Sequence, residues 1–524
     1  MSTLDYAGLT HFKSKLDSEI IAPLANRVAN IEEAEGLHKY GVSGIGGSTA
    51  ALTRLWDSVG MTAQVGTDGD NTSVINNFDD VKPFNRRKCV GNWELINGRP
   101  VFEVQAYLGD DNYAEDGTMG DYVAVECPKA YYYFKNGTLG ISAHQWDSDW
   151  KPFDIFCHDH NAEEVMDHIY LPAYALAKKD GHAVSLPGLP NEQGHYQGLT
   201  VAARTYNGAA GAKAILQPAA VNFYEWAMAT VEFATQNLQT IMAGCSALAS
   251  SNSDAAIFLD ATHVRVAYNA ARVAGEYVAI TKVTGHTDAA YLPTHKILSV
   301  TRCDDSGDPS SSGSYQKLEV LDLEAGYYEY NTTDTYYIAG RPYYTGSCNG
   351  VSTPSGSPVN NTNGYYPMKY RHRENIWGNQ YKTAADLFNQ RIASGNDYYL
   401  KWFYILDPSS YTPSSSSKPD ATDLATFHEL GVETAVANYK DGWIKSKKYD
   451  PEFPDIWIPY ETTGGSATTY FADYAFLVSS NAVRSVRFGG SWANGTTDGP
   501  SAVSAYYAPS YANANYGGDL CFAQ

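Results

Sequence analysis

The chain has 524 residues, a formal net charge of −21 and 44% hydrophobic residues, with 41 tyrosines and 45 glycines. Contacts with phosphates need clustered Lys and Arg, so this charge balance excludes binding to nucleic acid or to an anionic membrane surface. The apolar content suffices for a sizeable core, which excludes a disordered chain, and no apolar run approaches the roughly 20 residues that membrane insertion needs.

The first 39 residues are predicted to form a helical attachment or trimerisation segment. Leu9, Phe12 and Leu16 share one helical face, which is typical of a parallel trimer stalk or of a helix packed on the body. This end lacks the apolar core of a signal peptide, so we expect synthesis in the bacterial cytoplasm. Residues 40–94 are predicted to be a linker, Gly/Ser-rich over residues 40–50, and a β-rich lead-in.

Two hairpins and one helix are predicted between residues 95 and 252. LINGRPVFEVQAY and AYYYFKNGTLGIS each contain an Asn-Gly pair, the dipeptide preferred in two-residue hairpin turns. The periodicity of residues 222–242 predicts a helix. Asn222 is placed to cap this helix, with Glu225 as the return partner in a capping box.

Residues 253–365 are predicted to be a small inserted β-domain. HVRVAY, EYVAITKV, KILSVTR and QKLEVLDL alternate apolar and polar residues, and Gly/Ser/Asp-rich turns separate them. Four such strands fit a small barrel or a sandwich. The host domain then resumes at residue 366 and continues to residue 524.

Patterns for metal binding and catalysis are weak. The seven cysteines are scattered without a C-x-x-C pair, which predicts buried free thiols rather than a disulfide framework. In Cys157-His158-Asp159-His160 the two histidines would share a strand face without a third ligand, so ordinary surface or core histidines are favoured. Acidic residues are plentiful, but nothing indicates the paired carboxylates of glycan hydrolysis. We predict no metal, no cofactor and no enzymatic activity.

Four segments resemble, in order, C-type-lectin folds of the formylglycine-generating-enzyme type. RFGGSWANG, residues 487–495, resembles the R-x-GG-S-W-x-N-G signature, and YRHRENIWGNQY resembles the YRGIEN-WGN segment. The helix at residues 222–242 and FADYAF correspond to the second helix of the family and to the strand before the GGSW turn. The resemblance implies an α+β fold in which residues 95–252 and 366–524 are two parts of one C-type-lectin-like domain around the insertion.

The chain also departs from the family pattern. The family often ends in G-F-R, where this chain has Gly517-Gly518-Asp519, and its W-E-W is replaced by Tyr381-Lys382-Thr383. Oxidases of the family hold copper with two nearby cysteines, whereas Cys521 is the only cysteine in this region. The resemblance therefore implies the fold but not the oxidase chemistry.

The chain is most similar in style to phage tail proteins and to the variable proteins of diversity-generating retroelements. LDYAGLTHFKSKL resembles the start of tail-fibre and baseplate-associated chains. In the variable proteins, mutation of template adenines turns AAC codons into NNC codons, which cannot encode Lys, Glu, Gln, Met or Trp. Residues 493–523 contain none of these five types, so the resemblance implies a variable region over residues 485–520.

The composition of residues 501–518, SAVSAYYAPSYANANYGG, predicts a ligand-binding face. The stretch alternates too poorly to indicate a buried strand, and tyrosine with Ser, Asn and Gly has the chemistry of antibody loops. The scaffold residues are expected to be Gly489, Gly490, Trp492 and Gly495. The expected contact residues are Ser491, Ala493, Thr497, Asp498, Ser504, Tyr506, Tyr507, Tyr511 and Tyr516.

These features together imply a phage or prophage tail protein, located in the virion, that binds a host cell-surface protein or glycan. We expect it to contact other tail proteins and to form a homotrimer, which would add avidity for a repeated ligand. The alternative is a structural tail-fibre or baseplate subunit whose tyrosines pack between subunits. A glycan-cleaving tail enzyme and an ordinary surface loop are the other interpretations.

Overall fold

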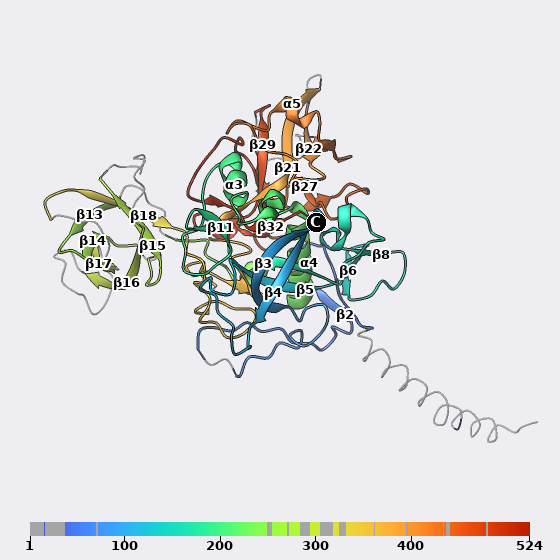
Figure 1. Ribbon diagram of the computed structural model, residues 1–524, viewed down its shortest axis with the longest axis horizontal. Coiled ribbons are helices and arrows are strands. Elements are labelled where there is room, and N and C mark those ends of the chain that lie inside the picture. Colours follow the sequence, from blue (N-terminus) through green and yellow to red (C-terminus); the bar gives the residue numbers. More distant parts are fainter. Residues whose placement is uncertain are drawn as a thin grey trace, which may run out of the picture.

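The computed structural model describes Lys15 and residues 37–69, 72–248, 254–269, 272–282, 294–303, 318–323, 332–360, 362–394, 397–432, 434–435, 441–477 and 480–523. Strands dominate these residues and helices are few (Figure 1), which confirms a β-rich α+β protein. The predicted N-terminal helical segment lies outside the described residues, apart from Lys15 and residues 37–39.

Two antiparallel sheets form from the first third of the chain, with strand orders β4-β3-β5-β9 and β2-β1-β7-β6-β8. Both predicted hairpins are confirmed, because Asn97 and Gly98, and likewise Asn136 and Gly137, have the two positive φ angles of a type I′ turn. The strands are β1 (Lys39–Ser43), β2 (Thr53–Trp56), β3 (Arg87–Ile96), β4 (Arg99–Tyr107), β5 (Tyr122–Pro128), β6 (Tyr131–Lys135), β7 (Thr138–Ser142), β8 (Trp150–Pro152) and β9 (His168–Pro172).

The segment predicted as a Gly/Ser linker begins with a buried strand instead. Strand β1 pairs with β2 on one side and β7 on the other, and Tyr40 and Val42 are both buried. A Cβ on Gly41 would lie 2.5 Å from the ring of Trp56. This glycine therefore marks a close approach inside a sheet rather than chain flexibility.

A larger sheet carries the C-terminal part of the chain. Its strand order is β23-β22-β21-β29-β30-β28-β25, with β24 beside β22 and β31 beside β21 (Figure 1). Strand β30 runs antiparallel to β29 and parallel to β28. The strands are β21 (Tyr381–Ser394), β22 (Asp397–Tyr404), β23 (His428–Glu429), β24 (Thr434–Ala435), β25 (Gly442–Trp443), β28 (Tyr474–Leu477), β29 (Val483–Gly489), β30 (Gly499–Ala505) and β31 (Tyr516–Gly517).

Short ribbons and helices complete the body. The β12–β32 ribbon ties the end of the chain to the strand that precedes the longest described helix, α4 (Ala219–Phe233). The ribbons pair β10 (Ala177–Lys179) with β11 (His182–Val184), β12 (Ala214–Leu216) with β32 (Leu520–Phe522), β19 (Lys369–Tyr370) with β20 (Arg373–Glu374), and β26 (Ser446–Lys448) with β27 (Ile458–Glu461). The short helices are α3 (Tyr196–Ala203), α5 (Ala421–Leu424), η2 (Asp154–Phe156), η3 (His158–His160), η4 (Ala209–Lys213), η5 (Leu238–Thr240) and η7 (Gly495–Thr497).

Helix α4 lies at the centre of the body, and all fifteen of its residues are buried. It begins and ends earlier than the sequence predicts, and the predicted capping box is wrong. Asn222 instead donates its amide to the carbonyl of Pro500 at 2.9 Å. The helix N-terminus is satisfied by the Asp386 carboxylate, which accepts from the Ala219 N–H at 3.0 Å.

Buried ion pairs fasten α4 to its surroundings. Glu232, which is fully buried, binds Arg371 at 2.6 Å. Glu225 lies between Arg86 at 2.9 Å and Arg373 at 2.7 Å. Arg371 and Arg373 both come from the YRHREN segment, which spans the turn from β19 into β20, so this segment fixes the helix in place.

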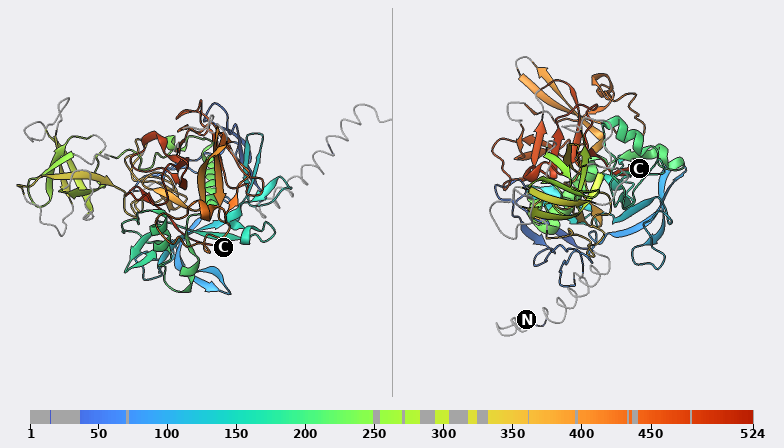
Figure 2. Two further views of the ribbon diagram at one scale, coloured as in Figure 1. Left: turned by 90° about the horizontal axis from the view of Figure 1, so that it is seen from above. Right: turned by 90° about the vertical axis from the view of Figure 1, so that its left-hand side faces the viewer.

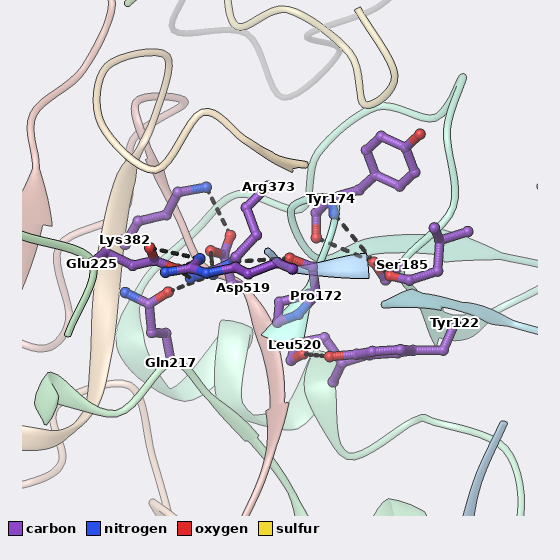
Figure 3. A network of polar contacts seen from close by, with 12 residues as sticks. Tyr122, Pro172, Tyr174, Ser185, Gln217, Glu225, Arg373, Lys382, Asp519 and Leu520 are labelled. Atoms are coloured by element: carbon purple, nitrogen blue, oxygen red, sulfur yellow. Dashed lines mark hydrogen bonds and ion pairs between the residues drawn. The ribbon is translucent and has the colours of Figure 1, made fainter. Parts of the chain in front are cut away.

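The network of buried ion pairs continues from Arg373 to the end of the chain (Figure 3). Arg373 also binds the Asp519 carboxylate at 2.9 Å, and Lys382 binds the other oxygen of the same carboxylate at 2.7 Å. Gln217 accepts a further bond from Arg373 at 2.9 Å. Because Asp519 directly precedes β32, this network fixes the C-terminal ribbon against α4.

The strands between residues 254 and 341 form a closed barrel, which lies to one side of the body in Figure 1 and in the left view of Figure 2. The order is β13-β14-β17-β16-β15-β18, and all four predicted strand segments lie in it. The predicted insertion continues past the barrel, where Tyr343 donates its N–H to Asn379 of the body at 2.7 Å. The strands are β13 (Asp254–Phe258), β14 (His263–Ala267), β15 (Tyr277–Thr281), β16 (Thr294–Cys303), β17 (Leu318–Leu323) and β18 (Tyr336–Arg341).

Candidate ligand-binding face

Four tyrosines near the C-terminus form one aromatic cluster, called here the tyrosine cluster. Tyr507 and Tyr511 stack, with ring centroids 4.1 Å apart and planes inclined by 15°. Tyr506 lies 4.8 Å from Tyr507, and Tyr516 lies 5.6 Å from both Tyr507 and Tyr511. Tyr506 and Tyr511 are each 38% exposed, so the outer members of the cluster offer ring faces and hydroxyls to a ligand.

Two strands hold the cluster at its ends. Strand β30 ends at Ala505, directly before Tyr506, and all seven of its residues are buried. Strand β31 pairs with β21, with Tyr516 opposite Tyr381. The expectation that residues 501–518 contain no buried strand is therefore wrong. Alternation is absent because β30 is covered on both faces, which suits its small Ala, Ser and Val side chains.

The nine predicted contact residues fall into two groups. Those that reach the surface, fully or in part, are Ala493, Thr497, Tyr506, Tyr507 and Tyr511. The others are at most 2% exposed: Ser491, Asp498, Ser504 and Tyr516. In the structure these four side chains are covered by the rest of the chain, so the exposed part of the predicted face is formed by the other five.

The buried residues shape the turn that carries the exposed ones. Asp498 accepts a hydrogen bond from the Ser491 N–H at 3.1 Å, and burial raises the pKa of its carboxyl well above the usual range. Gly490 has a φ of +79°, and a Cβ at this position would overlap the Asp498 carboxylate. The turn therefore needs glycine both for its backbone angle and for its space.

The residues predicted as scaffold lie at turn and core positions. Gly489 and Gly495 have φ angles of +85° and +61°, and Trp492 is 5% exposed. Trp492 packs in a small apolar cluster with Cys245, Leu248 and Tyr343. Tyr277 of the barrel and Ala514 of the tyrosine loop border the same cluster, so the base of the barrel and the tyrosine loop meet there.

Arg487 of strand β29 lies under the tyrosine cluster. Its side chain is fully buried, and none of its three nitrogens finds a hydrogen-bond partner among the described residues. The guanidinium carbon lies 4.1 Å from the centroid of the Tyr516 ring. Burial lowers the pKa of Arg487 to about 10, and the nearby tyrosines, Tyr516 first, oppose this only in part. The side chain is thus a buried cation with aromatic neighbours and no ion pair in the described chain.

A cavity of about 420 Å³ opens elsewhere, at the N-terminal end of α4, and no member of the tyrosine cluster lines it. One wall is His160, whose Nδ1 lies 2.7 Å from the Asp154 carboxylate and whose Nε2 lies 2.8 Å from the Leu406 carbonyl. A second cavity of about 300 Å³ is also lined by Asp154 and His160. The pair therefore separates two cavities.

Two features of the residues around His160 are unusual: the backbone angles of Asp159 and His160, and the shifted pKa values of nearby side chains. Asp159 and His160 have φ angles of +48° and +60°, a region that non-glycine residues rarely occupy and that clusters at functional sites. Burial alone would lower the pKa of His160, but the hydrogen bond and charge of Asp154 outweigh it and raise the pKa to about 9. Burial raises the pKa of the carboxyls of Asp386 and Asp455 to about 7.

Sequence reasoning considered the segment around His160 only as a weak metal site and missed Asp154 and Asp386. Their partners are far away in the chain, so no local pattern could have found them. Within the described ranges, no group of three His, Cys, Asp or Glu side chains is arranged to hold a metal ion. All seven cysteines are buried free thiols, which confirms that prediction.

Comparisons with known proteins add no family. No protein-family model matches the chain, and no curated protein matches its sequence. None of the helices in the described part of the chain is long and apolar enough to span a bilayer. The function is therefore argued from the residues and their geometry.

Proposed function

We propose that the chain is a receptor-binding protein of a phage or prophage tail. In this proposal the tyrosine cluster, with Ala493 and Thr497 on the neighbouring turn, binds a protein or glycan on the host cell surface. The protein belongs to the virion, contacts other tail proteins through its N-terminal segment and acts by binding rather than by catalysis. A homotrimer would raise its avidity for a repeated ligand.

The stacked and exposed tyrosines carry this proposal. Tyrosine offers a large amphipathic surface and loses little conformational entropy on binding, because only two side-chain torsions are fixed. Here the loop that bears Tyr506, Tyr507 and Tyr511 runs between two paired strands, so less ordering is needed when a ligand binds. Single exposed aromatic residues are common on protein surfaces, but a contiguous group of them, as here, is typical of an interaction site.

A C-type-lectin fold of the formylglycine-generating-enzyme type is part of the proposal. Its support is that the segments resembling the family are in direct contact. Gly378 of the WGN segment donates its N–H to the carbonyl of Gly489 at 2.9 Å, and Trp492 donates its N–H to the carbonyl of Asn379 at 3.3 Å. The indole of Trp377 is fully buried and donates to the carbonyl of Met242, just beyond α4, at 2.9 Å.

The two departures from the family pattern also support the proposal, because they are in contact with each other. Lys382 stands where W-E-W has Glu, and Asp519 stands where G-F-R has Arg. Both side chains are buried, and they form an ion pair of 2.7 Å. The two positions at which the chain departs from the family pattern are therefore joined by one buried ion pair.

Tyrosine substitutions test the function. Changing Tyr506, Tyr507 and Tyr511 together to Ala should abolish adsorption of the phage to its host and leave folding and tail assembly intact. Tyr268→Ala is a matched control, because Tyr268 is 39% exposed but lies on the barrel. Loss of tail assembly in the triple variant would favour the structural-subunit alternative, and unchanged adsorption would refute the proposal.

Diversification of this face has a separate test. Codons 485–524 are sequenced deeply in a propagated phage or lysogen population. Substitutions concentrated at adenine-derived positions of exposed residues such as Tyr511, with none at buried Ala502, would support a variable region over residues 485–520. A uniform population would instead indicate a fixed-specificity adhesin.

A further inference from the structure

We infer that the ligand of the tyrosine cluster is an acidic surface polysaccharide, and that Arg487 binds one of its carboxylates. This inference rests on the proposed function and names the chemical class of its ligand. It starts from the contrast between Arg487 and the buried arginines beside helix α4. Arg371 and Arg373 each bind at least one carboxylate, whereas Arg487 binds none in the described chain.

An isolated buried guanidinium is an unfavourable arrangement. The group has five N–H donors and a full charge, and it loses its hydration on burial without regaining hydrogen bonds. The Tyr516 ring compensates only in part, since a cation–π contact is weaker than a bidentate ion pair. A carboxylate from a ligand would supply the missing charge and acceptors. The arrangement is thus expected for a site that is complete only when its ligand is bound.

The path from solvent to Arg487 leads through the tyrosine cluster. Tyr516 lies on the guanidinium, and Tyr507 and Tyr511 lie on Tyr516 and reach the surface. Rotamer changes of partly exposed side chains are fast. Tyr507 and Tyr511 also lie near the guanidinium, so their rotation would open a path to Arg487 beside the Tyr516 ring without moving the strand that carries Arg487.

A carboxylated sugar fits these neighbours better than an acidic protein does. The planar carboxylate matches the guanidinium fork in a bidentate pair. The C–H faces of a pyranose ring pack on tyrosine rings, and its hydroxyls can exchange hydrogen bonds with the phenol groups of Tyr507 and Tyr511, which reach the surface. A repeating polymer also presents many identical carboxylates to an oligomer.

The test compares the same ligands with and without their charge. Binding of the full-length protein is measured on an array of bacterial surface polysaccharides, printed natively and after carbodiimide-mediated reduction of carboxyl groups to alcohols. We expect binding to native acidic members and its loss on the reduced array. Arg487→Met should weaken binding about a hundredfold, as expected for truncating one partner of a buried charge pair. Arg99→Met removes an exposed arginine on β4, outside the tyrosine cluster, so it is the control for a general loss of positive charge and should bind normally.

Thermal stability separates a binding role from a scaffold role. Arg487→Met should melt at the same temperature as the wild type or higher, because it removes a buried cation that has no partner. A lower melting temperature would show a scaffold role and overturn the inference. Equal binding to native and reduced polysaccharides, or adsorption that depends on the tyrosines without any polysaccharide binding, would also overturn it but leave the proposed function standing. Adsorption that is independent of the tyrosines would refute the proposed function itself.

Discussion

Buried charge is treated differently in two regions of this molecule. Around helix α4, Glu225 lies between two arginines and Asp519 lies between Arg373 and Lys382. Under the tyrosine cluster, Arg487 has tyrosines as its neighbours and no carboxylate partner in the described chain. Paired charges hold parts of the chain in place, whereas an unpaired charge retains the capacity to bind something else. The comparison therefore separates scaffold from candidate site.

The largest loss of stability is expected when one partner of a buried ion pair around helix α4 is removed. Asp519→Asn leaves Lys382, which is 2% exposed, without its counter-charge. Removing one partner of a buried pair destabilises by about 3–5 kcal/mol. The free energy of unfolding, measured in urea, should fall by this amount.

The matched control for this prediction is the double variant Asp519→Asn with Lys382→Met. It removes the stranded cation, so it should recover much of the lost stability, although Arg373 still lacks one of its acceptors. A single variant that loses less than about 1 kcal/mol would place the pair in the range of surface ion pairs. In that case buried ion pairs would not be what stabilises the scaffold, and pairing would not distinguish the scaffold from the candidate site.

Asp386 lies between these two extremes, because its buried carboxylate accepts backbone hydrogen bonds but forms no ion pair with a cationic side chain of the described residues. It accepts from the Ala219 N–H, yet burial raises the pKa of its carboxyl from 3.8 to about 7. The folded protein thus binds this proton more tightly than the unfolded chain, so the contribution of Asp386 to stability falls as the pH rises from about 4 to 7. Asp386→Asn keeps an acceptor for the helix and removes the charge.

The expected result is a crossover in pH dependence. Near pH 4 the variant and the wild type should have similar free energies of unfolding. Above pH 7 the variant should be more stable by about 2–4 kcal/mol, since each pKa unit corresponds to about 1.4 kcal/mol. Urea unfolding at pH 4, 6 and 8 measures this. Parallel curves for the two proteins would show that Asp386 is solvated rather than buried.

Local signals allowed part of the fold to be predicted. The Asn-Gly pairs specified both hairpins, because two consecutive positive φ angles favour those residue types. The four segments of the barrel could also be predicted, since their sequences alternate apolar and polar residues as half-buried strands do. Tyrosine enrichment indicated the exposed members of the cluster, such as Tyr506 and Tyr511, because no buried strand or helix would need so many of them.

Contacts distant in sequence could not be predicted. The cap of α4 is Asp386, which lies 167 residues from Ala219, so Asn222 was the better local candidate. Strand β30 has no alternation because it is buried on both faces. For the same reason Ser504 looked like a surface residue. Arg487 stood in a recognised motif, but its contact with Tyr516 and its lack of a hydrogen-bond partner among the described residues depend on the fold.

The smallest change in stability is expected for the pair of His160 and Asp154 between the two cavities, because this ion pair is partly exposed. The pKa of His160 is raised from 6.5 to about 9, so the protonated imidazole stabilises the fold fully below about pH 6.5, and this contribution is lost as the pH rises to 9. The side chain is 30% exposed, so solvent screens the pair with Asp154. His160→Gln keeps hydrogen-bonding groups but not the charge.

The melting temperature of the wild type should therefore fall more steeply between pH 6.5 and 9 than that of His160→Gln. His158→Gln is the neighbouring control, because His158 also lines the cavity of about 420 Å³ but is not the residue paired with Asp154, and this variant should follow the wild type. Equal slopes for all three proteins would mean that the contact between His160 and Asp154 is too well solvated to act as an ion pair. The wall would then depend on the Leu406 hydrogen bond and the left-handed backbone at Asp159, and the contrast between paired and unpaired charge would apply only to the fully buried interior.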